Sequence, residues 1–126
     1  MSEPAGAPPL LPLPEGALPS TQVLSLIGEK WTAVVLYALS LREVGHFNEL
    51  TRDIPGSSKK MLVKTLRQLE QDGLVERTVF PVVPPKVEYR LTEDGHRLRV
   101  PIAQLCQWGL DNAEFVAAIS ARRERP

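Results

Sequence analysis

Residues 57–91 carry one helix pattern followed by two strand patterns, and this order restricts the possible folds more than any other feature of the chain. From Ser57 or Ser58, both good N-caps, to about Asp72, leucines recur at the i, i+4 and i+7 spacing of one helical face: Leu62, Leu66 and Leu69. Two segments of alternating polarity follow, with the proline-rich segment 81–85 between them. Alternation is typical of half-buried strands, so we expect a helix followed by a hairpin.

Shorter helix patterns precede this unit, and one long pattern follows it. We expect helices over residues 20–27, 30–41 and 47–54, with a short strand in the turn between the second and third. After the hairpin, Thr92 is the expected N-cap of a helix that runs to about Ala118 with a kink at Pro101. On the second helix, the expected inward residues are Trp31, Val34, Val35, Ala38 and Leu41.

This order of elements predicts an α+β fold that is mainly α, namely a winged helix-turn-helix domain. Surplus apolar residues on the long C-terminal helix indicate that it serves as a dimerisation helix. Half of the twelve prolines fall in residues 1–19, a composition typical of an extended segment that buries little apolar surface. We therefore expect a flexible tail over 1–19 and one DNA-binding and dimerisation domain over 20–126.

The composition excludes several classes of protein. No apolar run approaches the roughly 20 residues of a membrane helix, and the N-terminus does not resemble a secretory signal, so we expect a cytoplasmic protein without membrane contact. One cysteine and two separated histidines predict neither a disulfide nor a metal site. The chain also lacks a glycine-rich phosphate loop and a nucleophile elbow, so we expect no enzymatic activity and no cofactor.

The outer face of the 57–72 helix is basic. Lys60, Lys64 and Arg67 repeat the leucine spacing on the opposite side, and the stretch from Ser57 to Arg67 contains four cations and no acid. Lysine and arginine on a helix in the major groove can reach guanine O6 and N7. We therefore expect this helix to bind duplex DNA through Ser58, Lys59, Lys60, Lys64 and Arg67. Cations of the hairpin are expected to contact phosphates or the minor groove: Arg77, Lys86 and Arg90.

A second interpretation of the basic face stays open at this stage. A charged outer stripe is also typical of a helix face that is simply solvated, and the formal net charge of zero does not favour nucleic acid. Glu76 and Glu88 lie among the hairpin cations and weaken that patch. The alternative function is a winged helix that binds an acidic protein partner without direct DNA readout.

Five segments resemble a known family, the HxlR-type regulators, which are related in architecture to the MarR family. The two shortest are His-Phe-Asn-Glu-Leu over 46–50 and Ser-Lys-Lys-Met-Leu over 58–62. The others are Leu-Ile-Gly-Glu-Lys-Trp-Thr over 26–32, Leu-Arg-Gln-Leu-Glu-Gln-Asp-Gly-Leu-Val-Glu-Arg over 66–77, and Val-Pro-Pro-Lys-Val-Glu-Tyr-Arg-Leu-Thr-Glu-Asp-Gly over 83–95. The similarity covers roughly residues 18–110. It implies a homodimer in which the first and last helices pack against their mates, and a recognition helix at 57–72.

The resemblance also implies a sequence-specific regulator, in the simplest case a repressor on a palindromic operator. Many relatives respond to electrophiles, aldehydes, quinones or oxidants, so a small-molecule or electrophile effector is expected. Many members carry a redox-active Cys-Pro pair before the first helix, where this chain has Leu18-Pro19. The thiol switch therefore does not carry over to that position. Cys106 is then either a buried packing residue, as free cysteines usually are, or an oxidation sensor at the dimer interface.

Overall fold

The computed structural model describes residues 18–124 of the 126-residue chain. The elements in chain order are α1 (Leu18–Ile27), α2 (Thr32–Ser40), α3 (Phe47–Asp53), α4 (Lys59–Gln71), β1 (Val75–Phe80), β2 (Lys86–Leu91), α5 (Glu93–Asp111) and α6 (Ala113–Glu124). This order confirms the expected mainly helical winged helix-turn-helix fold. The tail expected over 1–19 lies outside the described residues except for its last two positions, which begin α1. None of the described helices is long and apolar enough to cross a membrane.

The ends of α4 form as the sequence predicts. The Ser58 hydroxyl accepts a hydrogen bond from the Met61 amide at 3.1 Å and so caps the helix. Gly56 at φ 83° turns the chain between α3 and α4, and Gly73 at φ 76° ends α4. The α3–turn–α4 unit is therefore a helix-turn-helix whose geometry is set by local sequence.

The hydrophobic core lies where α2, α3, α4, α5 and the base of the hairpin meet. The three leucines expected to face inward on α4 are each 1% exposed. Two residues expected inward on α2 are not buried, because Val34 is 38% exposed and Leu41, which follows the helix, is 70% exposed. α2 contacts several elements at once and turns a different set of side chains toward them: Thr32, Val35, Leu36, Ala38 and Leu39.

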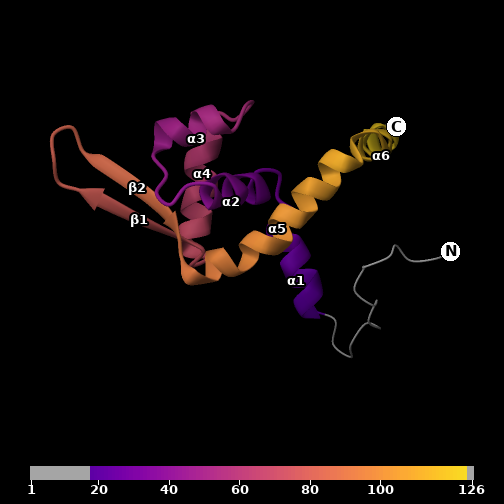
Figure 1. Cartoon of the computed structure of the whole chain (residues 1–126), viewed down its shortest axis with the longest axis horizontal. Helices are drawn as coiled ribbons and strands as arrows, with labels where there is room; N and C mark the ends of the chain where they lie inside the picture. The colour runs from indigo at the N-terminus through magenta and orange to yellow at the C-terminus, as the bar shows by residue number, and fades with distance from the viewer. Residues whose placement is uncertain (1–17, 125–126) are drawn as a thin grey trace.

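The hairpin pairs antiparallel from Val75 opposite Leu91 to Phe80 opposite Lys86. The short strand expected in the turn after α2 is reduced to one bridge, in which the Gly45 and Tyr89 backbones exchange two hydrogen bonds of 2.7 and 2.9 Å. Only the base of the hairpin is buried, and its tip projects from the helical body at the end opposite α6 (Figure 1). The prediction of half-buried strands is therefore wrong for the outer part of β1.

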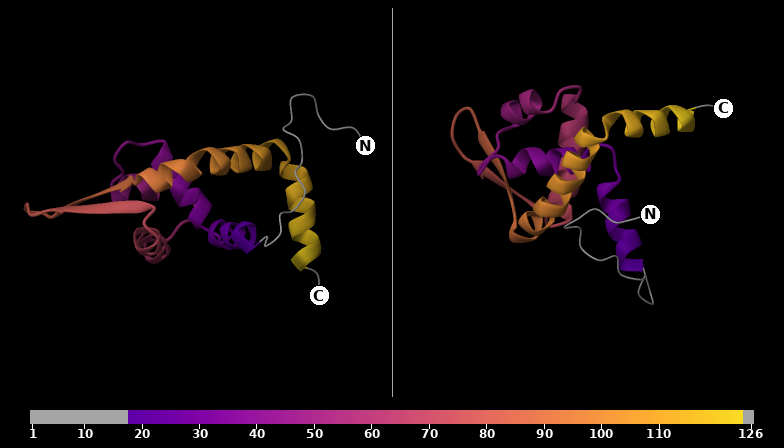
Figure 2. Two further views of the ribbon diagram at one scale, coloured as in Figure 1. Left: turned by 90° about the horizontal axis from the view of Figure 1, so that it is seen from below. Right: turned by 45° about the vertical axis from the view of Figure 1, so that its right-hand side comes forward.

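The C-terminal region is two helices where the sequence indicated one. Asn112, at φ −123° and ψ 32°, ends α5, and its side-chain amide donates to the Trp108 carbonyl at 2.8 Å. α6 then leaves in a new direction, as Figure 2 shows. Pro101, where a kink was expected, lies inside α5, and the helix continues past it to Asp111.

An ion-pair network fixes the loop before α3 to that helix. Arg42 contacts Asp53 through Nε at 2.7 Å and Glu49 through Nη1 at 2.7 Å. Glu49 also accepts hydrogen bonds from the His46 backbone amide at 3.0 Å and from His46 Nδ1 at 2.7 Å. The bonds from His46 lower the pKa of Glu49, and the bond from Arg42 lowers the pKa of Asp53.

These shifts predict an acid dependence of stability. Both carboxyl pKa values are lower in the folded state than their ordinary values of 4.5 and 3.8, so the stabilisation is fully present above those values. It is lost as the pH falls through the lower folded values. Urea unfolding at successive pH values should show a shallower acid decline for the Glu49→Gln, Asp53→Asn double variant than for the natural chain. Identical acid declines would contradict a stabilising role of the network.

Candidate nucleic-acid interface

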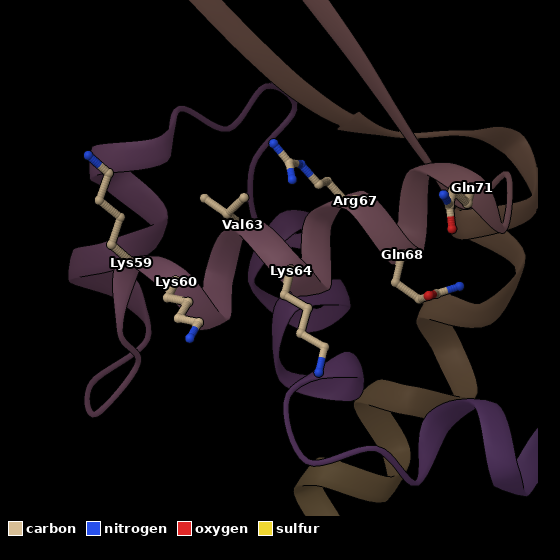
Figure 3. A pocket seen from close by; sticks show the side chains of 7 residues that line it. All are labelled: Lys59, Lys60, Val63, Lys64, Arg67, Gln68 and Gln71. Atoms are coloured by element: carbon tan, nitrogen blue, oxygen red, sulfur yellow. The ribbon is translucent and has the colours of Figure 1, made fainter.

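The basic face of α4 is open to solvent along the length of the helix. Lys59, Lys60, Lys64 and Arg67 are all exposed, and none of them forms an ion pair within residues 18–124. Figure 3 shows Lys60 and Lys64 pointing to one side of the helix and Lys59 and Arg67 to the other. Four cationic side chains thus stand opposite a fully buried leucine stripe. This arrangement is compatible with a helix that enters the major groove.

The turn before α4 holds this helix against α3. The Ser57 amide and hydroxyl both donate to the Ile54 carbonyl, at 3.2 and 2.7 Å. Ile54 itself is 2% exposed, so the turn is anchored in the core. Ser58 follows at the exposed start of the basic face, where its hydroxyl oxygen accepts the capping bond and its hydrogen stays available to donate. The first residues of α4 are therefore held in one orientation.

The register of the hairpin separates the three wing cations that the sequence analysis grouped together. Arg77 lies opposite Tyr89 on the face toward α4, whereas Lys86 and Arg90 lie on the other face. Both of these flank Glu88, at 3.8 Å each, and the Glu88 side chain is only 11% exposed. On its own face, Arg77 lies 3.6 Å from Glu70 of α4. The structure thus brings Arg77 together with α4 and places Lys86 and Arg90 elsewhere.

Sequence reasoning missed two residues that lie among the cations of α4. Val63 is half-buried between Lys59 and Arg67, where it offers an apolar contact of the kind that recognises a thymine methyl group (Figure 3). Gln68 extends the opposite side of the same face (Figure 3). The i, i+4 spacing of residues 59, 63 and 67 was a signal that could have identified Val63.

The other chemistry-bearing residues do not form a site. No group of three or more potential metal ligands occurs in the part of the chain that the structure describes. Cys106 is a free thiol on α5 that is partly buried against the hydrophobic core. This position agrees with a packing role for the cysteine. The described residues thus offer one candidate surface, formed by α4 and the adjoining hairpin.

Comparison with known proteins agrees with this geometry. Residues 26–116 match the family described as HxlR-like helix-turn-helix. The chain is 49% identical over 84 residues to the HTH-type transcriptional regulator YkvN of Bacillus subtilis, which covers 67% of this chain and 70% of that protein. It is 42% identical over 106 residues to the HTH-type transcriptional regulator YtfH of Escherichia coli, which covers 83% of this chain and 82% of that one.

Solved structures show the same similarity in three dimensions. The transcriptional regulator YtfH from Salmonella typhimurium has a TM-score of 0.67 and 39% identity, over 85% of this chain and 92% of that chain. The redox regulator HypR in its reduced form has a TM-score of 0.72 and 39% identity, over 79% and 98% respectively.

Substitutions on the two faces of α4 are predicted to have very unequal effects on stability. Leu66→Ala should lower the free energy of unfolding by about 2–5 kcal/mol, because it opens a cavity in the core. Lys64→Ala, on the solvent face of the same helix, should change it by less than about 0.5 kcal/mol. Urea titrations of the two variants give the comparison. A large loss of stability in Lys64→Ala would show that this face is structural.

Proposed function

The chain belongs to the HxlR-like helix-turn-helix family, and from this we propose that it represses transcription as a homodimer on a palindromic operator. It is a DNA-binding transcriptional regulator of the helix-turn-helix type and not an enzyme. The observation that carries the proposal is α4, whose exposed cations have no carboxylate partner among residues 18–124 while its leucines are buried. An interaction module without DNA readout, the alternative considered from the sequence, does not agree with the family.

The residues of the basic face are proposed to have two roles, base reading and phosphate contact. Residues near the N-terminus of a recognition helix commonly reach base edges, so Ser58, Lys59 and Lys60 are the proposed base readers, together with Lys64 one turn further on. Cations that meet phosphates position the protein without specifying sequence. Arg67 and the wing cations Arg77, Lys86 and Arg90 are proposed for that positioning role.

The proposed dimer interface lies on the side of the molecule away from the wing, which carries α1, the C-terminal part of α5 and α6 (Figure 1). These helices expose large apolar side chains that a stable monomer rarely leaves in water: Val23, Leu24, Val100, Leu105, Trp108, Leu110, Phe115 and Val116. Trp108 and Phe115 pack edge to face with ring centroids 6.2 Å apart and join α5 to α6. A second copy of the chain is the proposed occupant, because two α4 helices could then meet two half-sites.

Repression and its control follow from this arrangement. A dimer on two half-sites covers DNA that RNA polymerase would otherwise contact, so repression by exclusion needs no further surface. HypR, a structural neighbour, is a redox regulator. Cys106 is partly buried against the core, an environment that favours packing, and we propose no thiol switch there. An electrophile or other small-molecule effector would have to act at another position.

The assigned reading face predicts a local effect on DNA binding. Lys60→Ala should weaken binding to a duplex selected from a random library by about 1–3 kcal/mol, while secondary structure and dimerisation stay unchanged. Arg97→Ala, which removes an exposed cation of α5, is the matched control and should leave affinity unchanged. The affinity of the natural chain should fall steeply with salt. For each phosphate neutralised, the logarithm of the association constant should fall by about 0.9 for every tenfold rise in salt concentration. Unchanged binding by Lys60→Ala would mean that another face reads DNA.

The proposed interface predicts the assembly state. Trp108→Asp should shift the protein from dimer to monomer in sedimentation velocity, because a charge would have to be buried between the copies. Val83→Asp, at a fully exposed position in the hairpin loop, is the matched control and should stay dimeric. A dimer that persists in Trp108→Asp at low micromolar concentration would place the interface elsewhere.

A further inference from the structure

A crevice between α4 and the hairpin collects two cations, one acid and one hydroxyl. Its volume is about 270 Å³, and its lining residues are Val63, Arg67 and Glu70 from α4 with Arg77 and Tyr89 from the strands. Arg77 Nε lies 3.6 Å from Glu70 Oε1, and both side chains are about 40% exposed, at 44% and 40%. Arg67 takes part in no ion pair among the described residues. The crevice therefore carries a net positive charge and opens to solvent.

The path of duplex DNA crosses this crevice if α4 lies in the major groove. The major and minor grooves are separated by one sugar-phosphate backbone, and the hairpin lies beside α4, where the adjacent minor groove would run. The backbone between the two grooves must then pass over the junction of α4 and the strands. The groups at that junction are therefore placed to meet a phosphate.

We propose that Arg67, Arg77 and the Tyr89 hydroxyl form a binding site for one backbone phosphate of each half-site, and that Glu70 competes with this phosphate for Arg77. The site rests on the proposed function, since it requires α4 in the major groove. Arginine binds phosphate oxygens well because its planar guanidinium presents two parallel donors. The Tyr89 hydroxyl adds a third donor, and the Tyr89 backbone is fixed by its bridge to Gly45.

The electrostatics of Tyr89 agree with a donor role. Burial raises the pKa of the Tyr89 hydroxyl, while the charges of Arg77 and Arg67 act to lower it. A tyrosine hydroxyl is protonated at neutral pH, so it can donate to an anion. The Glu70 carboxylate acts on the same hydroxyl in the opposite sense and raises its pKa.

Glu70 gives the site an internal competitor. Its distance of 3.6 Å from Arg77 is long for an ion pair, and exposed pairs of this kind contribute little to stability. Arg77 can therefore exchange the carboxylate for a phosphate at little cost, but the Glu70 charge stays in the crevice and repels the DNA. Removing that charge should strengthen DNA binding, which is the opposite of what the loss of a contact residue does.

The test combines variants of the protein with neutral phosphates in the DNA. Duplexes of the selected operator carry a single methylphosphonate at each position in turn, and each is titrated with the natural chain and with Tyr89→Phe and Glu70→Gln. Tyr89→Phe should weaken binding to unmodified DNA by about tenfold, as expected for a lost hydrogen bond to a charged group. Glu70→Gln should tighten binding. It should also make the slope of log affinity against log salt concentration steeper by about 0.9.

At one phosphate per half-site, the effect of the methylphosphonate on affinity should depend on whether Tyr89 or Glu70 has been substituted. A methylphosphonate at that position should weaken binding by the natural chain, and it should weaken binding by Tyr89→Phe less, because that variant has already lost the hydroxyl contact while both arginines remain. Tyr37→Phe and Glu93→Gln change the same residue types at exposed positions outside the crevice and serve as controls without effect. Additive effects at every phosphate, or weaker binding by Glu70→Gln, would overturn the assignment.

The same titrations separate this inference from the proposed function. If Lys60→Ala weakens binding but the effect of Tyr89→Phe is the same at every phosphate, α4 still reads DNA and the assignment of the crevice as a phosphate site fails. If Lys60→Ala has no effect either, α4 does not read the operator and both proposals fail.

Discussion

Burial of three leucines on one side of α4 is the constraint on which the rest of the structure depends. Leu62, Leu66 and Leu69 are each 1% exposed, and they fix both the position of the helix and its rotation about its own axis. Because side chains on a helix keep fixed angular positions, this rotation also points the lysines and Arg67 into solvent. Core packing therefore also determines the orientation of the proposed reading face, because both faces belong to the same thirteen-residue helix.

The distribution of charge explains how a chain of zero net charge can bind a polyanion. The cations of α4 have no acidic partner in the described part of the chain, whereas Arg77, Lys86 and Arg90 each lie within 4 Å of a glutamate. Phosphate contacts supply affinity for any sequence, and base contacts supply specificity. Glutamates beside the wing cations reduce the affinity for phosphate and leave the base contacts unchanged. The acids are therefore part of the proposed recognition surface.

The sequence predicted what local interactions decide. The Ser58 cap, the end of α4 at Gly73 and the two faces of α4 depend on residues within one or two turns of each other, and the structure agrees with all of them. Features that depend on tertiary contacts were missed. The inward side of α2 is set by several neighbouring elements at once, so the sequence wrongly predicted that Val34 is buried. The end of α5 at Asn112 has no strong local sequence signal. The approach of Arg77 to Glu70 of α4 also depends on how the hairpin packs against that helix.

The most direct test of the central claim is a map of the surface that DNA contacts. Amide chemical shifts of the isotope-labelled protein, followed during titration with its selected operator duplex, report on each described element separately. The largest changes should occur over residues 57–71 and along the hairpin, with the exposed sides of α1, α5 and α6 unaffected by DNA. Changes concentrated on α5 and α6, with α4 unmoved, would contradict the assignment of α4 as the DNA-reading helix.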